Sequence, residues 1–560
     1  MIALGINGWM ERSHDAAACL VMDNRIVAMV EEERFTRRKN SFDTLPLGSI
    51  AYCLQAGNIE PDDIDVIAWG WDLPLLHKVH GMVFPYDTSV LNDLLFPKKY
   101  YPKKRKIIPV EFVSHHLAHA ASVYCSRGDD EPMPIVVIDG SSEECSVSIF
   151  LGMAGGIELI RAYPMQSSPG YFYEAGCKYL GFTPQQAGKL MGLACYGEPT
   201  RVNFFKEVSG GFDAPLSGLK LAANNSLDWE EEIVREWMTI FEATWGSKIN
   251  PSYCFSTSRG SFNPWLEPGI RERNIASSLQ AELERIYSGY VREAVGTTGY
   301  KNVALAGGVS LNCSANGMLL DIGVADRICI QPAANDSGVA LGAAVLMLGS
   351  VPQGMLTTPY LGPEFSRDEI SLLLKKIKAD FDEPDDIYLE TAKEIEVGKV
   401  VGWFNGRMEF GPRALGGRSI LADPRSAFMH SIVNDIKTRE QWRPLAPSVL
   451  EEEASNFFRS GRKSPYMLIR DFVRDGKASL VPAVVHVDRS SRLQTVNEGM
   501  NPCFHKLLTS FQSLTGIPIL LNTSFNDERE PIVCTPADAL KTFFGTGLDL
   551  LVLGPFLVRK

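Results

Sequence analysis

Short apolar runs separated by polar turns mark the first part of the chain. The run at 2–5 precedes a turn-rich loop, and the runs AACLVM and RIVAMV follow it, joined by Asp23 and Asn24. A strand, a loop and a tight β-hairpin have this pattern. From residue 134 the pattern returns as PIVVIDGS, SVSIFLG and GIELIRAY, with the last two joined by Ala154-Gly155-Gly156. The repetition predicts an internal duplication whose two loops face each other across a phosphate-binding cleft, and chance is the alternative because hairpins are common.

Between and after these units, the sequence pattern predicts further helices and strands, separated by glycine turns. PLGSIAYCLQAG predicts a helix that ends at Gly57, and DVIAWG predicts a strand. Helices are expected around 171–197 and 275–296, a strand at 303–308, and a helix of small residues at 337–348. The stretch 349–365 is rich in proline and glycine, which predicts a domain boundary. We therefore expect one domain over 1–352 and a second, α/β in class, over 353–560.

Charge and cysteine content narrow the class of protein. Lys and Arg number 55 against 67 Asp and Glu, a net charge of −12, which argues against nucleic acid as the main partner. The 11 cysteines are an odd number without a C-x-x-C pair, so a disulfide framework or zinc knuckle is not expected. No apolar run reaches the roughly 18 residues that a membrane-spanning helix needs. The opening residues lack the pattern of a signal peptide. These features predict a cytoplasmic protein that does not bind membranes.

Histidines and aspartates form the first candidate site. In SHHLAHA, His115 and His119 are four residues apart, so they share one face if the segment is helical. Asp139 ends an apolar strand, and Asp336 precedes the helix of small residues. Two imidazoles and one or two carboxylates suit a divalent metal such as iron, manganese or zinc. The spacing alone leaves ordinary helix residues as the alternative.

Glycine loops form a second candidate site. GGVSLN at 307–312 follows a strand and precedes a helix, where backbone N–H groups can approach a phosphate. AGKLMGLACYG at 187–197 is a second such segment, but neither is a Walker A loop. With the duplication, these loops predict an ATP cleft of the actin, hexokinase and heat-shock ATPase type, and structural turns are the alternative. The candidate nucleotide contacts are Lys189, Gly192, Gly307, Gly308, Asn312 and Gly338.

Cations gather early in the second domain. Seven lie between 407 and 443, interleaved with glycine and proline, and Arg489, Arg492, Asn522 and Asn526 follow. Arginine forks bind phosphates and carboxylates bidentately, so the segment predicts an anion site. Surface arginines paired with the acidic surplus are the alternative. The seven cations are Arg407, Arg413, Arg418, Arg425, Lys437, Arg439 and Arg443.

Taken together, the motifs resemble one family, the two-domain O-carbamoyltransferases of antibiotic and nodulation-factor biosynthesis. The matching stretches run in a fixed order over nearly the whole chain. They are GIN…HDAAACL…EEERFTRRK, SHHLAHAAS, VVIDG, GKLMGLACYG, LAGGVSLNC, NDSGVALGAA, GRMEFGPRALGGRSILADPR, WRPLAPSV, RLQTV and LLNTSFN.

The resemblance implies a fold and a reaction. The N-terminal domain would be TsaD-like, a duplicated actin-like (ASKHA) fold, and the C-terminal domain YrdC-like. Carbamoyl phosphate and ATP, the latter with magnesium, would give carbamoyl-adenylate in the C-terminal domain. The carbamoyl group would then pass to a hydroxyl of a small-molecule natural product or sugar at the metal site of the N-terminal domain. A homodimer is left open.

The resemblance also assigns residues. The metal ligands would be His115, His119, Asp139 and Asp336, with iron favoured over manganese or zinc. From its place in the first loop, His14 is our candidate for the general base on the acceptor hydroxyl, and a cap of its own turn is the alternative. Carbamoyl phosphate and ATP in the second domain would be bound by Arg413, Arg418, Lys437, Arg443, Arg492 and Asn522, of which the first four would also be catalytic.

Three other functions compete with this one. A tRNA threonylcarbamoyl-transfer enzyme uses the same two folds, and the net charge of −12 speaks against it. A nucleotide-dependent switch of the actin type leaves the arginine-rich domain without a role. Hydrogenase-maturation carbamoyltransferases carry C-x-x-C zinc motifs that are absent here. The region 200–270 is either an acceptor-binding segment or, as we favour for Trp229 to Trp237, an amphipathic helix.

Overall fold

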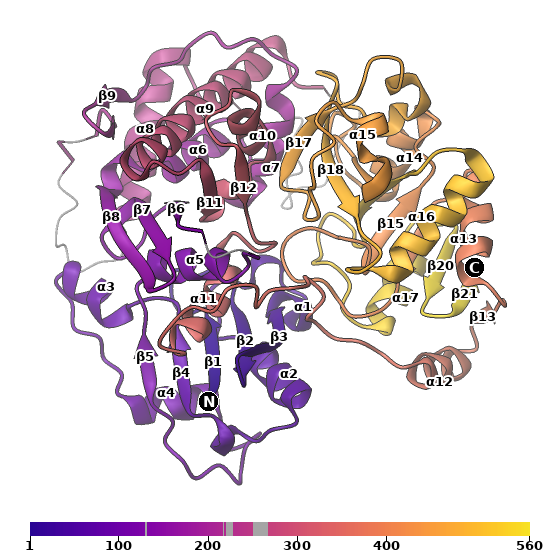
Figure 1. Cartoon of the computed structure of the whole chain (residues 1–560), viewed down its shortest axis with the longest axis horizontal. Helices are drawn as coiled ribbons and strands as arrows, with labels where there is room; N and C mark the ends of the chain where they lie inside the picture. The colour runs from indigo at the N-terminus through magenta and orange to yellow at the C-terminus, as the bar shows by residue number, and fades with distance from the viewer. Residues whose placement is uncertain (129–130, 217, 220–227, 250–266) are drawn as a thin grey trace. The chain divides into compact units, whose positions relative to one another are not determined.

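The structure is a computed structural model that describes residues 1–128, 131–216, 218–219, 228–249 and 267–560 (Figure 1). Within these ranges, 1–249 and 270–357 form one compact unit, and 358–560 belong to a second. No helix in the described ranges combines the length and the apolar character needed to cross a membrane. Part of the region 200–270 lies outside the described residues. The rest of this region contains the predicted helix, which is α8 (Trp229–Trp245).

Two five-stranded sheets with the same strand order build the first unit. In each sheet the first strand along the chain lies antiparallel to the second and parallel to the fourth, and both sheets have the order third, second, first, fourth, fifth. The first sheet contains β1 (Ile2–Asn7), β2 (Ala17–Met22), β3 (Arg25–Glu31), β4 (Val66–Trp69) and β5 (Val110–Phe112). The second contains β6 (Met133–Ile138), β7 (Cys145–Met153), β8 (Gly156–Pro164), β11 (Asn302–Ala306) and β12 (Arg327–Cys329).

The matching sheets confirm the predicted duplication and the actin-like fold of this unit. Each hairpin turn lies where the sequence predicts it. Asp23 and Asn24 have positive φ angles of 48° and 57°, as a tight hairpin turn requires, and Gly156 has a φ of 140°. The helical pattern expected at 171–197 is two helices, since Gly181 at a φ of 81° separates them. They are α6 (Pro169–Tyr179) and α7 (Ala187–Ala194).

Small residues let one helix lie close against its neighbours in this unit. The helix α11 (Val339–Leu346) packs on β1 and on α5 (His115–Tyr124). A Cβ added to Gly342 would lie 1.7 Å from the carbonyl oxygen of Ala118, and one added to Gly5 would lie 1.9 Å from that of Ala340. The remaining helices are α1 (Glu33–Thr36), α2 (Leu47–Gly57), α3 (Leu73–Val79), α4 (Thr88–Leu95), α9 (Ile270–Thr298) and α10 (Cys313–Asp321), and a small ribbon pairs β9 (Lys206–Val208) with β10 (Gly211–Asp213).

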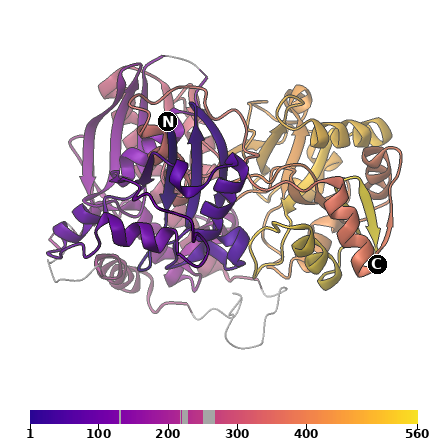
Figure 2. The same cartoon turned by 90° about the horizontal axis from the view of Figure 1, so that it is seen from below.

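The second unit is α/β, as expected, and is built on one nine-stranded mixed sheet. Its order is β13-β21-β20-β14-β15-β19-β16-β18-β17, and the interior strands β14 and β20 are buried throughout. The first residue directly precedes β1 and the last directly follows β21, and the two ends are marked in Figure 2. The strands are β13 (Asp380–Asp382), β14 (Val401–Phe404), β15 (Arg418–Ala422), β16 (Ala446–Leu450), β17 (Ile469–Phe472), β18 (Ser490–Val496), β19 (Ile519–Ser524), β20 (Leu550–Leu553) and β21 (Phe556–Arg559).

Helices of the second unit pack on this sheet and on one another. The helix α12 (Arg367–Ile377) begins at a capping box, in which Ser366 accepts from the Glu369 N–H and the Glu369 carboxylate accepts from the Ser366 N–H. α13 (Ile387–Glu396) packs against α16 (Pro502–Thr515). The others are α14 (Phe428–Ile436), α15 (Ala454–Phe457) and α17 (Pro536–Gly545).

Candidate functional site

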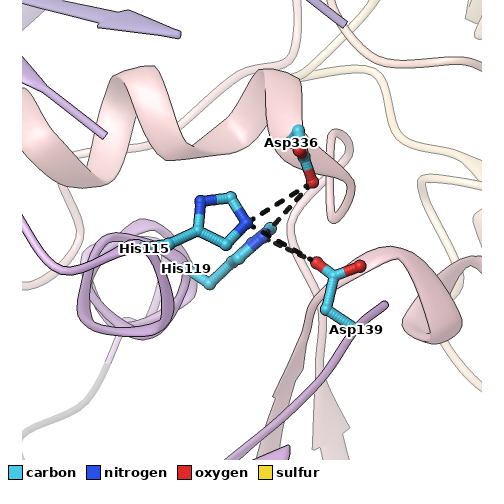
Figure 3. Close-up of side chains that lie close together, drawn as sticks. All are labelled: His115, His119, Asp139 and Asp336. Atoms are coloured by element: carbon cyan, nitrogen blue, oxygen red, sulfur yellow. Dashed lines mark ion pairs between the residues drawn. The ribbon is translucent and has the colours of Figure 1, made fainter. Parts of the chain in front are cut away.

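Three elements of the first unit bring together the four side chains expected to bind metal. His115 and His119 are one turn apart on α5, and both are fully buried. Asp139 directly follows the last residue of β6, and Asp336 opens the short turn before α11. Figure 3 shows both imidazoles and both carboxylates directed toward a common point. The close packing of α11 on α5, which Gly342 permits, places Asp336 beside the histidines.

The distances within this cluster fit a metal ion. His119 Nε2 lies 2.9 Å from Asp139 Oδ2 and 3.7 Å from Asp336 Oδ1, and His115 Nε2 lies 3.6 Å from Asp336 Oδ1. One ligand atom from each of the four residues lies within 4.8 Å of the others. A metal about 2.1 Å from each ligand places neighbouring ligand atoms about 3 to 3.5 Å apart.

The cluster also contains buried polar atoms that have charged neighbours but no hydrogen bond of acceptable geometry within the described residues. Among the described residues, no group forms a hydrogen bond of acceptable geometry with His115 Nε2, His119 Nε2 or Asp139 Oδ2. Buried polar atoms are normally paired, because an unpaired one costs about 1–3 kcal/mol. The donor set, two imidazole nitrogens and two carboxylate oxygens, is one that a divalent transition metal accepts. The residues therefore fit the metal that the sequence predicts.

Contacts outside the cluster orient His115. Its Nδ1 lies 3.0 Å from the carbonyl oxygen of Gly70, so Nδ1 carries the proton and Nε2 presents its lone pair to the cluster. The ring of Trp71 stacks on the imidazole, with 3.8 Å between centroids. Both contacts come from the segment just after β4, which thereby fixes the tautomer and the plane of the ring.

Glu143 fixes the backbone at the same place. Its carboxylate accepts hydrogen bonds from the backbone N–H of His115 at 3.0 Å and of Asp72 at 2.8 Å. Glu143 is only 2% exposed, and this burial raises its pKa above the ordinary value. The side chain thus joins the start of α5 to the segment that orients His115.

The two aspartates make the centre of the cluster electronegative. Burial lowers the pKa of His119, but Asp139 and Asp336 outweigh it and raise that pKa to about 9. Burial would raise the pKa of Asp336, yet the neighbouring histidines hold it well below its ordinary value. A cation between these carboxylates is therefore favoured, and a metal ion would replace the proton on His119.

His14 lies in the first loop and is held by its neighbour. Its Nδ1 is 3.2 Å from Asp15 Oδ2, and that oxygen also accepts from Asn335 Nδ2 at 2.7 Å. Asn40 Nδ2 donates to the other oxygen of Asp15 at 3.1 Å. Asn335 directly precedes Asp336, so the loop with His14 is tied to the segment with the aspartate. The His14 side chain is 46% exposed, which leaves the ring accessible to a substrate.

The predicted nucleotide-binding segments lie in different surroundings. Gly307 has a φ of 87°, and a Cβ there would lie 2.3 Å from the carbonyl oxygen of Ile138, so this loop runs directly beside the end of β6. A Cβ on Gly308 would lie 3.3 Å from Asp139 Oδ1. Asn312, by contrast, caps α10 and exchanges hydrogen bonds with Gln280.

The other three predicted nucleotide contacts are tightly packed. Lys189 is buried on α7, and the same helix contains Gly192. A Cβ on Gly338 would lie 2.1 Å from the carbonyl oxygen of Ala333. Of the six predicted residues, Gly307 and Gly308 lie beside the end of β6 and Asp139, and Gly338 lies in the same short turn as Asp336.

In the second unit, two predicted substrate-binding cations contact backbone oxygens. Arg418 is fully buried, donates to the carbonyls of Asn405, Gly406, Gly417 and Pro363, and stacks on the ring of Phe404 at 3.6 Å. Lys437 Nζ donates to the carbonyl of Asn526 at 2.8 Å, to its Oδ1 at 2.9 Å, and to the carbonyl of Ser524. These hydrogen bonds join loops of the second unit to one another without the help of a ligand.

A second group of cations in this unit is paired with carboxylates. Arg443 NH1 lies 2.8 Å from Glu528 and 3.6 Å from Glu440. Burial and the charges of Arg443 and Arg492 lower the pKa of Arg439 well below its ordinary value, although the carboxylates of Glu528 and Glu440 act in the opposite direction. Burying several cations together is costly, and a bound anion would relieve the repulsion.

Comparison with known proteins now identifies the family. The family model described as Carbamoyltransferase N-terminus matches residues 3–345, and the one described as Carbamoyltransferase C-terminus matches residues 392–560. The chain belongs to the carbamoyltransferase family. It is therefore a transferase, and the family resemblance carried by the sequence motifs is confirmed.

Similar proteins cover most of this carbamoyltransferase. Nodulation protein NolNO of Sinorhizobium fredii (strain NBRC 101917 / NGR234) is 36% identical over 599 residues, which cover 100% of this chain and 83% of that protein. Nodulation protein NolO of Bradyrhizobium diazoefficiens is 37% identical over 465 residues, or 80% of this chain and 79% of that protein. A solved structure of full-length HypF in the phosphate- and nucleotide-bound form gives a TM-score of 0.31 at 11% identity, covering 62% of this chain and 55% of HypF. The fold assignment rests on the strand order of the two sheets.

Sequence reasoning missed several residues that hold the sites of this carbamoyltransferase. Glu143 lies four residues after Asp139 in the same turn, and Asp15 directly follows His14, so closeness to a candidate residue is the signal that was available. Trp71 and the carbonyl of Gly70 gave no signal, because their contact with His115 depends on how the sheet is built.

Proposed function

We propose that this carbamoyltransferase is an ATP-dependent O-carbamoyltransferase with two reaction sites. The second unit would form carbamoyl-adenylate from carbamoyl phosphate and ATP, and the first would transfer the carbamoyl group to a hydroxyl of a small molecule or sugar. The observation that carries the proposal is the buried cluster of His115, His119, Asp139 and Asp336, whose ligand atoms lie within 4.8 Å of one another. Family membership supplies the transferred group.

The activation step consumes one water and releases two phosphate products. Loss of phosphate from carbamoyl phosphate by hydrolysis leaves carbamate, whose oxygen attacks the α-phosphorus of ATP. The bond from that phosphorus to the pyrophosphate oxygen breaks, so carbamoyl-adenylate, pyrophosphate and phosphate are formed. Cations neutralise charge that develops on the phosphates. We assign this role to Arg413, Arg443, Lys437 and Arg492, and on the family resemblance we include Arg418 and Asn522 in the same binding site.

In the transfer step, an acceptor hydroxyl attacks the carbamoyl carbon. The bond between that carbon and the adenylate oxygen breaks, AMP leaves, and the hydroxyl proton passes to His14. Asp15, 3.2 Å from His14 Nδ1, keeps that ring turned so that Nε2 can accept the proton. A divalent metal, for which we favour iron, would be held by the cluster and would supply Lewis-acid polarisation of the carbamoyl carbonyl.

A product assay tests this proposal. The full chain is incubated with carbamoyl phosphate, ATP and magnesium, first without and then with a pooled panel of hydroxyl compounds, and nucleotides are measured by mass spectrometry. Carbamoyl-adenylate, or AMP that depends on carbamoyl phosphate, is expected, with carbamate esters appearing when an acceptor is present. If neither AMP nor carbamate esters form with any acceptor, the proposal is wrong. AMP that requires threonine and bicarbonate instead would favour the threonylcarbamoyl route.

A further inference from the structure

A buried side chain closes the turn that contains Asp336. Gln331 lies two residues after β12 and is fully buried, and its Oε1 accepts from the backbone N–H of Ala333 at 2.7 Å. Its Nε2 donates to the carbonyl oxygen of the same residue. Pro332, between them, has no N–H to offer. One side-chain amide therefore pairs with both backbone groups of Ala333, three residues before Asp336.

The same amide also contacts the helix that contains the two histidines of the cluster. Gln331 Nε2 lies 3.4 Å from Ser122 Oγ, and that hydroxyl donates to the carbonyl oxygen of His119 at 2.7 Å. Ser122 is fully buried on α5, three residues after His119. A chain of hydrogen bonds thus runs from the backbone of one candidate ligand on α5 to the turn that supplies Asp336.

These hydrogen bonds determine which way the Gln331 amide points. In the flipped orientation, Oε1 would face the carbonyl oxygen of Ala333 and Nε2 would face its N–H, so both pairs would repel. Ser122 Oγ gives its proton to the carbonyl of His119, so towards Gln331 it can only accept. Both neighbours therefore require the same orientation of the amide.

The rest of the turn packs closely around this amide. A Cβ at Gly338 would lie 2.2 Å from Gln331 Nε2 and 2.1 Å from a backbone carbonyl oxygen of the turn, so only glycine fits there without a shift. On the other side of the turn, Asn335 Nδ2 donates to Asp15 Oδ2 in the first loop at 2.7 Å. Side-chain hydrogen bonds therefore hold the turn on both sides of Asp336 before any metal binds.

We propose that Gln331 is a positioning residue of the metal site, which keeps Asp336 within reach of an ion bound by the histidines of α5. This inference rests on the proposed function and adds how ligands from separate elements stay together. Asp336 Oδ1 is 3.6 Å from His115 Nε2 and 3.7 Å from His119 Nε2, a spacing that one metal ion can bridge. Without the amide, the buried N–H and carbonyl of Ala333 lose their partner, so the turn must move to pair them again.

The test measures metal affinity directly and does not depend on turnover. Gln331→Met keeps the size of the side chain and removes its donor and its acceptor. Anaerobic titration of the full chain with Fe²⁺ or Mn²⁺ should give a dissociation constant about 10- to 100-fold higher than in the unaltered chain. Gln353→Met is the matched control, because this half-buried glutamine donates to the hydroxyl of Tyr124 on the same helix at 2.9 Å. Its affinity should stay within about 2-fold of the unaltered chain.

A second background shows whether the effect acts through Asp336. In Asp336→Ala the ligand that Gln331 positions is missing, so adding Gln331→Met should change the affinity by less than about 3-fold. A general loss of packing would weaken binding equally in both backgrounds. Ser122→Ala keeps the pairing of Gln331 with Ala333 and removes only the link to α5. It should weaken binding about 5-fold, the net value of one hydrogen bond, and it decides the matter if Gln331→Met does not fold.

The possible results separate this inference from the proposed function. Unchanged metal affinity in the folded variants of Gln331 and Ser122 overturns the inference alone. An effect of Gln331→Met that is equally large in the Asp336→Ala background overturns it too, because the amide would then act on something other than that ligand. An unaltered chain that binds neither Fe²⁺ nor Mn²⁺ overturns the metal site of the proposed function, and this inference with it.

Discussion

The two candidate sites differ in how far their buried polar groups are already hydrogen-bonded within the protein. In the first unit, nitrogens of His115 and His119 and an oxygen of Asp139 face one another without hydrogen bonds of acceptable geometry, in the part of the chain that the structure describes. In the second unit, Arg418 and Lys437 are bonded to backbone carbonyls, and Arg443 to carboxylates. The first site therefore keeps buried polar atoms without hydrogen bonds, whereas the cations of the second already have partners and must exchange them to bind an anion.

This difference separates two kinds of functional evidence. Unpaired buried donors and acceptors indicate a ligand directly, because the protein alone leaves their cost unmet. Buried cations that already have partners serve the fold as well, so their number alone says little about the substrate. In the second unit, the stronger indication of a ligand is Asn522 Oδ1, a buried acceptor without a hydrogen bond within the described residues, and not the count of arginines.

The largest effect is expected from His119→Ala, which removes one ligand of the cluster. Metal affinity should fall roughly 1000-fold, and transfer to the acceptor should be lost, because only three ligands remain and His115 Nε2 is the one nitrogen left beside Asp139 and Asp336. AMP formation without acceptor should stay within about 2-fold of the unaltered chain. Metal content by mass spectrometry and AMP formation, measured on the same preparation, check both parts. If AMP formation is also lost, the division into two sites is wrong.

Arg443→Lys should have the next largest effect, and on the other step. Lysine keeps the charge beside Glu440 and Glu528 but loses the fork that binds a phosphate with two bonds. The KM for carbamoyl phosphate in AMP formation should rise roughly 100-fold, with metal content unchanged. Steady-state kinetics without acceptor measures it. An unchanged KM would mean that Arg443 serves only its two carboxylates.

Sequence alone predicts the first site better than the second, for a physical reason. His115 and His119 are one helical turn apart, and Asp139 ends a buried strand, so local periodicity already indicates where these side chains point. The partners of Arg418 are the carbonyls of residues 405, 406, 417 and 363, which no local pattern relates to it. The duplication was visible in the hairpins, but the split between α6 and α7 depended on the single turn at Gly181.

Glu143→Ala should weaken the metal site without removing a ligand. The change removes the acceptor of two backbone N–H groups, the buried one of His115 and the part-buried one of Asp72, so the start of α5 and the ring contact with Trp71 loosen. Outer contacts of this kind typically change metal affinity 10- to 100-fold. Anaerobic titration with Fe²⁺ or Mn²⁺ measures the affinity, and Glu144→Ala, the exposed neighbour, is the matched control. Equal affinity in both variants would show that Glu143 does not position His115.

Arg418→Lys should give the smallest effect, but it tests the comparison of the two sites most directly. Four carbonyls accept from this guanidinium and a phenylalanine ring stacks on it, so a lysine cannot replace all its contacts. The free energy of unfolding should fall by about 1–2 kcal/mol, measured by urea denaturation, while the KM for carbamoyl phosphate changes less than 3-fold. The family resemblance assigns Arg418 to the substrate, and that assignment predicts the reverse, a KM at least 10-fold higher with stability unchanged. A cation already bonded to the fold can serve the substrate only by giving up those bonds, so the two measurements together decide which role Arg418 has.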